Sequence, residues 1–546
     1  MPRPDQQEPV VFELVEGEGP DGVAAPVGAP PADSPGRRLP LLPRLSRRTW
    51  LVAAAVVAVV VAGTTTVDLV RGHLRAELMR TSPVGVASLA EMPERGWTVP
   101  FDVPTPPSDE AYVDQPLVTM DGLLVLPPGS AQSYTVDPFT GLAEAVPVGF
   151  DDVVAVDPDS GEVAWRVPLN EAPVCGPTSP DASMSVDALV CVHGPEDARE
   201  VVTVAPDGAT RSRPADPADG EQVFPGPDGM LVRVTRTGGG AAAEEVLCDD
   251  LGTCTPSVLE RGRDVRVVAE DAATGAERWA TTVEFRPTET VNCQQQVADS
   301  GRTTVDTYRV TMRTGAESVA VDGCGVAATL STRGVRLDLA GESGDDTGGA
   351  GDAGAEVPAS SAWVTEIGAG LFAVETGSTE TLVVDDEGQV LRTLPGWVRT
   401  ETIISPDAPD DLWFVTRTGG YGFDAVRRDG SVAWTDRKSQ GILLVGRDVV
   451  VADRGGRVVG LARETGDQVW AWDGGDTTGM ARYRTLTDGR TVAMEHLPQD
   501  GKLGGLIVAL DLGTGEKRWI APVAGTAVAV DGELVEISKD GLTGLD

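Results

Sequence analysis

Short runs of apolar residues, separated by polar turns that contain glycine, recur along most of the chain. Five segments share one pattern, in which a glycine stands four residues before a tryptophan: VVAVDPDSGEVAW (153–165), VVAEDAATGAERW (267–279), GFDAVRRDGSVAW (422–434), VVGLARETGDQVW (458–470) and IVALDLGTGEKRW (507–519). The paired positions are Gly161 and Trp165, Gly275 and Trp279, Gly430 and Trp434, Gly466 and Trp470, and Gly515 and Trp519. With 65 glycines in 546 residues, 11 tryptophans would show this spacing by chance about 1.3 times, so five copies indicate an internal repeat.

Each segment predicts a β-hairpin. Residues 507–510 are typical of a strand, and Asp511, Thr514 and Gly515 predict a turn, because glycine accepts positive φ and short polar side chains bond the turn backbone. The second strand delivers a large aromatic side chain that a single hairpin cannot bury and a neighbouring repeat can. The tryptophans are therefore predicted to pack one repeat on the next, with a ligand cage as the alternative.

Weaker copies of the turn stand around Gly208, Gly341 and Gly388. The eight turn glycines from 161 to 515 are on average about 51 residues apart, which suits four strands per repeat. The final unit, 525–546, stops before its last strand, while residues 94–103 resemble that strand, with Trp97 in the tryptophan position. We expect this N-terminal strand to complete the C-terminal sheet, which gives about eight four-stranded blades, with seven or nine as alternatives.

One apolar stretch differs from all others, because residues 49–67 carry no charge. At ~1.5 Å per residue, 19 residues reach ~28 Å, close to the hydrocarbon thickness of a bilayer, so a single transmembrane helix is predicted at 49–69. Five arginines precede the stretch closely and three follow it, which places the N-terminus in the cytoplasm and the C-terminal domain outside. A buried core helix and a cleaved signal peptide are the alternatives.

The predicted division of the chain follows from this span. Residues 1–48 are rich in Pro, Gly and acidic residues and are expected to form a disordered cytoplasmic tail. Residues 70–93 are assigned to a stalk, and residues 94–546 to a single extracellular domain of repeats. The apolar cluster at 10–15 is interpreted as part of this solvated tail, with a docking peptide as the alternative.

The charge limits the partners. Acidic residues outnumber basic ones 84 to 44, and the net charge of -40 lies entirely in residues 81–546. This balance argues against nucleic acid or an anionic membrane surface as the partner of the folded domain. The protein is instead predicted to meet the membrane through one helix and to bind a protein or cell-envelope partner.

All six cysteines follow the predicted span, and an even number in an exported domain indicates disulfides. Six cysteines allow 15 pairings. Their sequence contexts favour pairs that are local to one structural unit: Cys175 with Cys191, Cys248 with Cys254, and Cys293 with Cys324. Zinc is the alternative, but no C-x₂-C spacing is present.

The pattern A-x-D-x-x-T-G-x-x-x-W is matched best by Ala509, Asp511, Thr514, Gly515 and Trp519. It resembles the repeat of pyrroloquinoline-quinone (PQQ)-type β-propellers, the quinoprotein alcohol dehydrogenase-like superfamily. The resemblance covers residues from roughly 94 to the end, and the other copies depart from the pattern at one to three positions. It implies an all-β, PQQ-like β-propeller fold, which specifies an architecture better than an activity.

The dehydrogenases of this superfamily typically combine a vicinal disulfide, a tryptophan floor and a calcium ion near a catalytic Asp. No two cysteines are adjacent in this chain, and no C-x-x-C-H haem motif is present. The loop at 157–162 has a passing likeness to a calcium loop, but the repeat turn already explains its residues. Residues 342–356 form an acidic, glycine-rich segment that is interpreted as a loop between blades, with a low-affinity cation site as the alternative. Three histidines, far apart in sequence, are a poor inventory for catalysis. No catalytic residue, cofactor site or metal site is therefore predicted.

The favoured function is a non-enzymatic, membrane-anchored extracytoplasmic propeller that serves as a scaffold for protein or cell-envelope partners. Within the resemblance, its nearest analogue is the propeller lipoprotein that scaffolds outer-membrane barrel assembly. The alternative is a PQQ-dependent oxidoreductase with a degenerate site. A sensor that signals through its single helix is a third hypothesis.

Overall fold

The computed structural model of the chain divides into two units, Met1–Thr66 and Val67–Asp546. The structure describes residues 72–545 except for 103–110, 113–117, 130, 137–142, 170–172, 177–183, 196–197, 239–246, 249–253, 256–257, 297–302, 309, 339–362, 369, 376–379, 400–402, 418–420, 475–480, 497–504 and 539. The predicted tail at 1–48 and the predicted span at 49–69 lie outside these residues. Among the residues described, no helix has the length and apolar character needed to cross a membrane.

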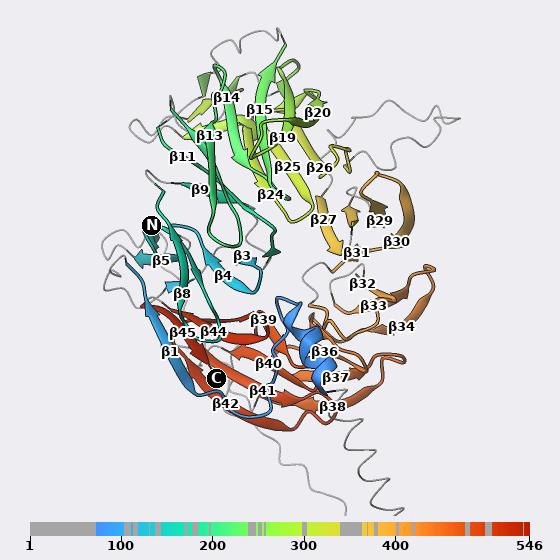
Figure 1. Ribbon diagram of the computed structural model, residues 1–546. Helices are drawn as coiled ribbons and strands as arrows, with labels where there is room; N and C mark the ends of the chain where they lie inside the picture. Colours follow the sequence, from blue (N-terminus) through green and yellow to red (C-terminus); the bar gives the residue numbers. More distant parts are fainter. Residues whose placement is uncertain are drawn as a thin grey trace, which may run out of the picture. The chain divides into compact units, whose positions relative to one another are not determined.

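Nine antiparallel sheets, named repeat sheets 1–9, follow one another along the described residues (Figure 1). Sheet 1 consists of β3 (Val118–Met120), β4 (Leu123–Leu126), β7 (Val153–Val156) and β8 (Val163–Val167), with β10 (Met184–Ser185) added parallel to β3. Sheet 2 consists of β9 (Val174–Gly176), β11 (Leu189–His193), β12 (Glu200–Val204) and β13 (Thr210–Pro214). Sheet 3 consists of β14 (Glu221–Pro225), β15 (Met230–Thr237), β19 (Asp264–Asp271) and β20 (Glu277–Val283).

Sheet 4 consists of β24 (Val310–Thr314), β25 (Ser318–Gly323) and β26 (Val326–Ser331). Sheet 5 consists of β27 (Trp363–Gly368), β28 (Leu371–Glu375), β29 (Glu380–Asp385) and β30 (Val390–Pro395). Sheet 6 consists of β31 (Trp397–Val398), β32 (Leu412–Thr416), β33 (Phe423–Arg427) and β34 (Val432–Asp436).

Sheet 7 consists of β35 (Gly441–Val445), β36 (Val449–Asp453), β37 (Val458–Ala462) and β38 (Gln468–Trp472). Sheet 8 consists of β39 (Ala481–Thr487), β40 (Thr491–His496), β41 (Gly505–Asp511) and β42 (Lys517–Val523). Sheet 9 consists of β43 (Thr526–Val530), β44 (Glu533–Ser538), β45 (Gly541–Leu545) and β1 (Arg95–Pro100).

Three smaller sheets come from insertions between these strands. They contain β2 (Ala111–Tyr112), β5 (Ala131–Val136) and β6 (Ala143–Val148); β16 (Leu247–Cys248), β17 (Cys254–Thr255), β22 (Gln294–Gln296) and β23 (Thr303–Val305); and β18 (Val258–Leu259) with β21 (Thr288–Glu289). The short 3₁₀ helix η1 (Thr290–Cys293) follows β21, and a helix covers residues 72–80.

Burial along the strands reflects the stacking of sheets on both sides. The inner strands are buried on both faces, as in β7, β36 and β44, and therefore read as continuous apolar runs in the sequence. Outer strands such as β8 alternate instead between exposed and covered positions. The apolar core is divided into clusters that each join two neighbouring sheets, for example Leu444 of sheet 7 with Met494 of sheet 8.

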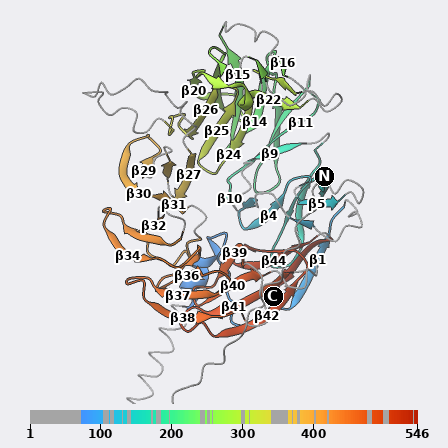
Figure 2. The same cartoon turned by 180° about the vertical axis from the view of Figure 1, so that it is seen from behind.

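The N-terminal strand completes the C-terminal sheet, as the sequence predicts. β1 pairs antiparallel with β45, with Thr98 opposite Thr543 and Pro100 opposite Gly541. Both views place the blue strand β1 at the edge of the red strands β44 and β45 (Figures 1 and 2). One core cluster then joins this composite sheet 9 to sheet 1, through Val535 and Leu124 among others.

The number of repeat sheets differs from the favoured prediction of about eight and equals one of its alternatives, nine. Seven of the eight predicted turns lie in seven different sheets, sheet 4 has a turn at another glycine, and the composite sheet is additional. One described turn is not among those predicted. Gly334 has positive φ at the end of sheet 4, where the sequence pointed to Gly341, a residue outside the described part.

Residues 79–90, assigned to a stalk from the sequence, lie against the repeat sheets. Met79 and Leu89 are buried. The amide of Val86 donates to the carbonyl of Thr487 at 2.8 Å, and the amide of Leu89 donates to Asp488 Oδ2 at 2.8 Å. This segment therefore joins the turn between β39 and β40.

Candidate functional site

Where a repeat carries the tryptophan, its indole reaches the next repeat sheet or the segment that leads into it. Every indole nitrogen described in this position donates a hydrogen bond of 2.7–2.9 Å to a backbone carbonyl beyond its own sheet. The donor and acceptor pairs are Trp97 with Pro158, Trp165 with Pro206, Trp279 with Thr332, Trp434 with Arg463, Trp470 with Leu512, and Trp519 with Leu89. Because a buried indole N–H needs an acceptor, these bonds both satisfy the donor and set the spacing of the sheets.

In five turns the glycine makes room for the tryptophan of the preceding sheet. A Cβ atom at Gly161 would lie 2.4 Å from the ring of Trp97, and one at Gly466 would lie 2.5 Å from the ring of Trp434. Both glycines have positive φ. Glycine is thus required twice, by the turn conformation and by the aromatic ring against it.

A small residue also stands opposite each tryptophan within its own sheet. Ala155, Ala269, Ala425, Gly460 and Ala509 are the register partners of Trp165, Trp279, Trp434, Trp470 and Trp519. In sheet 9, Gly544 lies beneath Trp97 in the same way. The alanine of the sequence motif therefore leaves the space that the indole fills.

The aspartate of the motif holds the turn. Asp511 Oδ1 accepts hydrogen bonds from the amides of Gly513 and Thr514 at 2.9 Å, and Asp271 Oδ1 accepts from the amide and hydroxyl of Thr274. The Thr274 hydroxyl is the main cause that lowers the pKa of Asp271. Asp157, in the segment that resembles a calcium loop, accepts from two turn amides in the same way, so the turn itself accounts for its conformation.

Arginine replaces tryptophan in two repeats, a substitution that the sequence pattern missed. Arg213 Nε donates to the carbonyl of Ala272 at 2.8 Å, and Arg392 Nε donates to the carbonyl of Arg428 at 3.2 Å. Arg392 stands four residues after Gly388, so its spacing was visible in the sequence. An N–H donor on a long side chain makes the same contact to the next turn.

Two disulfides join neighbouring segments, Cys175 with Cys191 and Cys293 with Cys324. They are two of the three pairs favoured by the sequence. Cys175 and Cys191 are register partners of β9 and β11. Cys248 and Cys254 are backbone partners in β16 and β17, but their side chains lie outside the described part.

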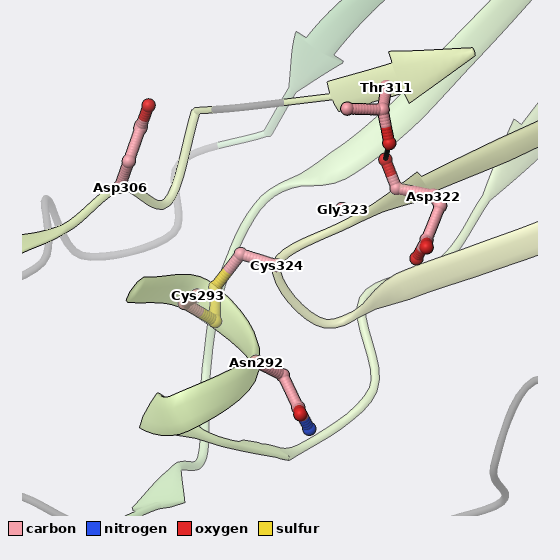
Figure 3. A pocket seen from close by; sticks show the side chains of 7 residues that line it. All are labelled: Asn292, Cys293, Asp306, Thr311, Asp322, Gly323 and Cys324. Carbon is pink, nitrogen blue, oxygen red and sulfur yellow. Dashed lines mark hydrogen bonds between the residues drawn. A yellow bond between two sulfur atoms is a disulfide. The ribbon is translucent and has the colours of Figure 1, made fainter. Parts of the chain in front are cut away.

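A small cavity of about 190 Å³ adjoins the second disulfide (Figure 3). It is lined by residues of η1, the segment after β23, and sheet 4: Asn292, Cys293, Asp306, Thr311, Asp322, Gly323 and Cys324. The Thr311 hydroxyl donates to the carbonyl of Asp322 at 3.2 Å. The disulfide thus fastens the insertion between β20 and β24 to the turn between β25 and β26.

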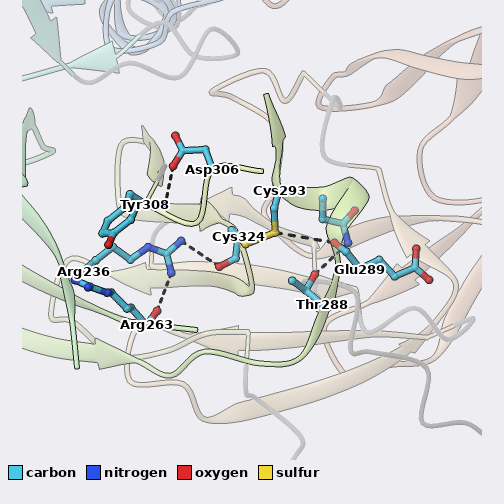
Figure 4. The surroundings of a disulfide bond; sticks show 9 residues. Arg236, Arg263, Thr288, Glu289, Cys293, Asp306, Tyr308 and Cys324 are labelled. Atoms are coloured by element: carbon cyan, nitrogen blue, oxygen red, sulfur yellow. Dashed lines mark hydrogen bonds between the residues drawn. A yellow bond between two sulfur atoms is a disulfide. The ribbon is translucent and has the colours of Figure 1, made fainter. Parts of the chain in front are cut away.

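Arg236 ties a third strand to this region (Figure 4). Its guanidinium donates to the carbonyl of Arg263 at 2.8 Å and to the carbonyl of Cys324 at 3.1 Å. Burial lowers the pKa of Arg236, and the carboxylate of Asp306 opposes that shift. These contacts position the insertion but place no nucleophile beside a base.

The described residues hold no group of three or more His, Cys, Asp or Glu side chains placed to bind a metal ion. The histidines are on separate elements, with His73 in the helix at 72–80, His193 in β11 and His496 in β40. What the geometry provides is a series of tightly joined sheets with insertions on them.

A family model described as outer membrane protein assembly factor BamB matches residues 133–352 and 352–540. The chain belongs to this family. Its PQQ-like repeats account for the turn and tryptophan contacts described above. No curated protein matches the sequence significantly.

Two solved structures similar to the chain are distant. One is BamB from Moraxella catarrhalis, with 14% identity, 65% of this chain and 92% of that chain covered, and a TM-score of 0.32. The other is dihydro-heme d1 dehydrogenase NirN in complex with DHE, with 12% identity, 79% of each chain covered and a TM-score of 0.32. Because the identities and TM-scores are this low, the assignment of the chain to its family rests on the family model.

Proposed function

We propose that the protein is a non-enzymatic, membrane-anchored β-propeller outside the cytoplasm that acts as a scaffold for protein or cell-envelope partners. The observation that carries this proposal is the match of two long segments to the family of an outer-membrane assembly factor. A scaffold needs a rigid surface, and the indole and arginine contacts between successive sheets supply that rigidity. The partner is expected to be a protein of the cell envelope.

The proposal includes a closed ring of nine blades. Its support is that contacts pass from each sheet to the next and return from sheet 9 to sheet 1, through a shared core cluster and the bond from Trp97 to Pro158. Closure would remove two free sheet edges, each of which is a template for unwanted pairing.

The location follows from chemistry on both sides of the predicted span. Disulfides persist in oxidising compartments, and two of them lie in the part of the chain that follows the predicted span. The arginines before residue 49 favour a cytoplasmic N-terminus. The division into a tail (1–48), a transmembrane helix (49–69) and an external domain therefore remains part of the proposal.

The scaffold role is tested by capture of partners from intact cells. The full chain, expressed at native level, is cross-linked in living cells, purified from membranes and examined by mass spectrometry. A single-pass protein with an unrelated external domain serves as the control. A defined envelope protein enriched over this control supports the proposal, and an identical set of captured proteins contradicts it.

The oxidoreductase alternative has its own experiment. The full chain in detergent is titrated with pyrroloquinoline quinone and calcium while the absorbance spectrum of the quinone is followed. Saturable binding at one quinone per chain would overturn the non-enzymatic assignment. Absence of saturation removes the alternative.

A further inference from the structure

Two exposed tryptophans, Trp363 and Trp397, lie outside the repeat contacts, and Trp363 is the more exposed. Trp363 begins β27 and is 62% exposed, whereas the repeat tryptophans of sheets 6–8 are 6–7% exposed. Its register partner is Glu375, the last residue of β28. Because directly opposed residues of an antiparallel pair project from the same face, the indole and the carboxyl group are side-chain neighbours.

Glu375 is half-buried, and among the described residues it has neither a counter-ion nor a side-chain hydrogen bond. Burial raises its pKa, and no opposite charge offsets this effect. The next residue in the row, Thr381, is fully buried, and its hydroxyl donates to the carbonyl of Gly396 at 2.6 Å rather than to the carboxyl group. The acceptors of Glu375 therefore stay open.

The nearest strand ends of sheet 6 do not supply the missing cation. The strand β32 ends at Thr416, which is the register partner of Trp397. The next residue, Arg417, forms an ion pair of 2.7 Å with Asp424 and is therefore already neutralised. Further along the same face of sheet 5, Ala373 and Val383 are buried in the core shared with sheet 6. This face of sheet 5 is therefore packed in the interior of the sheet, whereas its end carries the exposed indole of Trp363 and the carboxylate of Glu375.

We propose that Trp363 and Glu375 form a docking position for an arginine or lysine side chain of a protein partner. This inference rests on the proposed scaffold function and names the chemistry of its partner. A cation gains by stacking on an indole and by a charge-assisted hydrogen bond to a carboxylate. Exposed tryptophans are enriched among the residues that dominate protein interfaces. The carboxylate disfavours an anionic ligand or an anionic lipid surface at the same place.

The test uses the full chain in detergent, labelled with 5-fluorotryptophan, and ¹⁹F NMR. The Trp363 resonance is assigned by its loss in Trp363→Phe. The probes are the capped peptide Gly-Arg-Gly and its citrulline analogue, which keeps the shape of arginine without its charge. We expect the arginine peptide to shift the Trp363 resonance with an affinity at least tenfold higher than that of the citrulline peptide, while the Trp397 resonance stays in place.

The substitution Glu375→Gln should lower the affinity for the arginine peptide at least fivefold. Glu277→Gln, which removes an exposed carboxylate from β20, is the matched control and should leave the affinity unchanged. Equal binding of the two peptides, or full affinity in Glu375→Gln, overturns the inference. Since the titration needs no cellular partner, its failure leaves the scaffold function standing, whereas failure of cellular capture leaves the peptide result standing.

Discussion

The indole nitrogen of Trp519 donates a hydrogen bond of 2.9 Å to the carbonyl of Leu89, which lies 430 residues earlier in the chain. In other repeats the acceptor belongs to the turn before the outer strand of the next sheet. Sheet 9 has no such turn, because its outer strand is β1. The segment that leads into β1 therefore takes the place of the missing turn.

Replacing Trp519 with Phe should loosen this N-terminal segment. The change removes the donor to Leu89 and leaves a buried carbonyl unpaired, at a cost of about 1–3 kcal/mol in the free energy of unfolding. Hydrogen exchange should become faster at residues 84–89. Trp434→Phe is the matched control, because Trp434 is equally buried at 7% exposure but donates to Arg463. Faster exchange at 84–89 in both variants would contradict the assigned role of Trp519.

Deleting residues 94–103 should lower the melting temperature by many degrees. The deletion removes β1 with Trp97, exposes the edge of β45 and opens the core cluster shared by sheets 9 and 1. Calorimetry of the full chain in detergent provides the measurement. Deletion of ten residues of the predicted tail, 18–27, is the control, and an equal melting temperature in the two deletions would refute closure by β1.

Gly466→Ala should destabilise the protein more than Gly430→Ala. Both glycines have positive φ, so each alanine costs about 1 kcal/mol of backbone strain. A Cβ atom at Gly466 would also lie 2.5 Å from Trp434, whereas one at Gly430 meets no atom within 4 Å. The difference between the variants in urea unfolding therefore reports the contact with the ring. Equal destabilisation would mean that the turn alone requires glycine.

The turn aspartates should make stability fall in acid. The hydroxyl of Thr274 lowers the pKa of Asp271, so its ionised form is favoured in the folded state. This stabilisation is present above the ordinary carboxyl pKa of about 3.9 and is lost as pH falls through the lowered value. Asp271→Asn should flatten the acid limb of a plot of unfolding free energy against pH. Glu277→Gln, an exposed position, should leave that limb unchanged.

Removing the disulfide between Cys293 and Cys324 should cost about 2–4 kcal/mol of stability. The bond between Cys175 and Cys191 closes a shorter stretch, with a sequence separation of 16 against 31. Because doubling a loop adds about 0.6 kcal/mol of closure entropy, the double Cys→Ala variant at 293 and 324 should be the less stable of the two. Chemical unfolding of both variants measures the difference, and the reverse order would indicate that local packing outweighs loop length.

The turns and tryptophans could be predicted from the sequence because their requirements are local. Gly515 and Asp511 act within one turn, and Trp519 follows at a constant distance. Gly334 was missed because no tryptophan follows either Gly334 or Gly341 to mark which of them makes the turn. Arg392 stands at the tryptophan spacing after Gly388, but its role depends on a carbonyl in the next sheet. Arginine is charged and tryptophan is apolar, so a hydrophobic pattern does not relate them. What they have in common is an N–H donor that reaches a carbonyl of the next sheet.

The sequence by itself determined the all-β repeat, its turn chemistry, and the strand at 94–103 that completes the last sheet, since spacing and side-chain type suffice for each. Only the tertiary structure decided that there are nine repeat sheets in the described part, that Leu89 accepts from Trp519, and that Trp363 and Glu375 stand side by side without a cation. These relationships join residues that are far apart in the chain or on different strands. They depend on how sheets pack, which no local pattern of residues records.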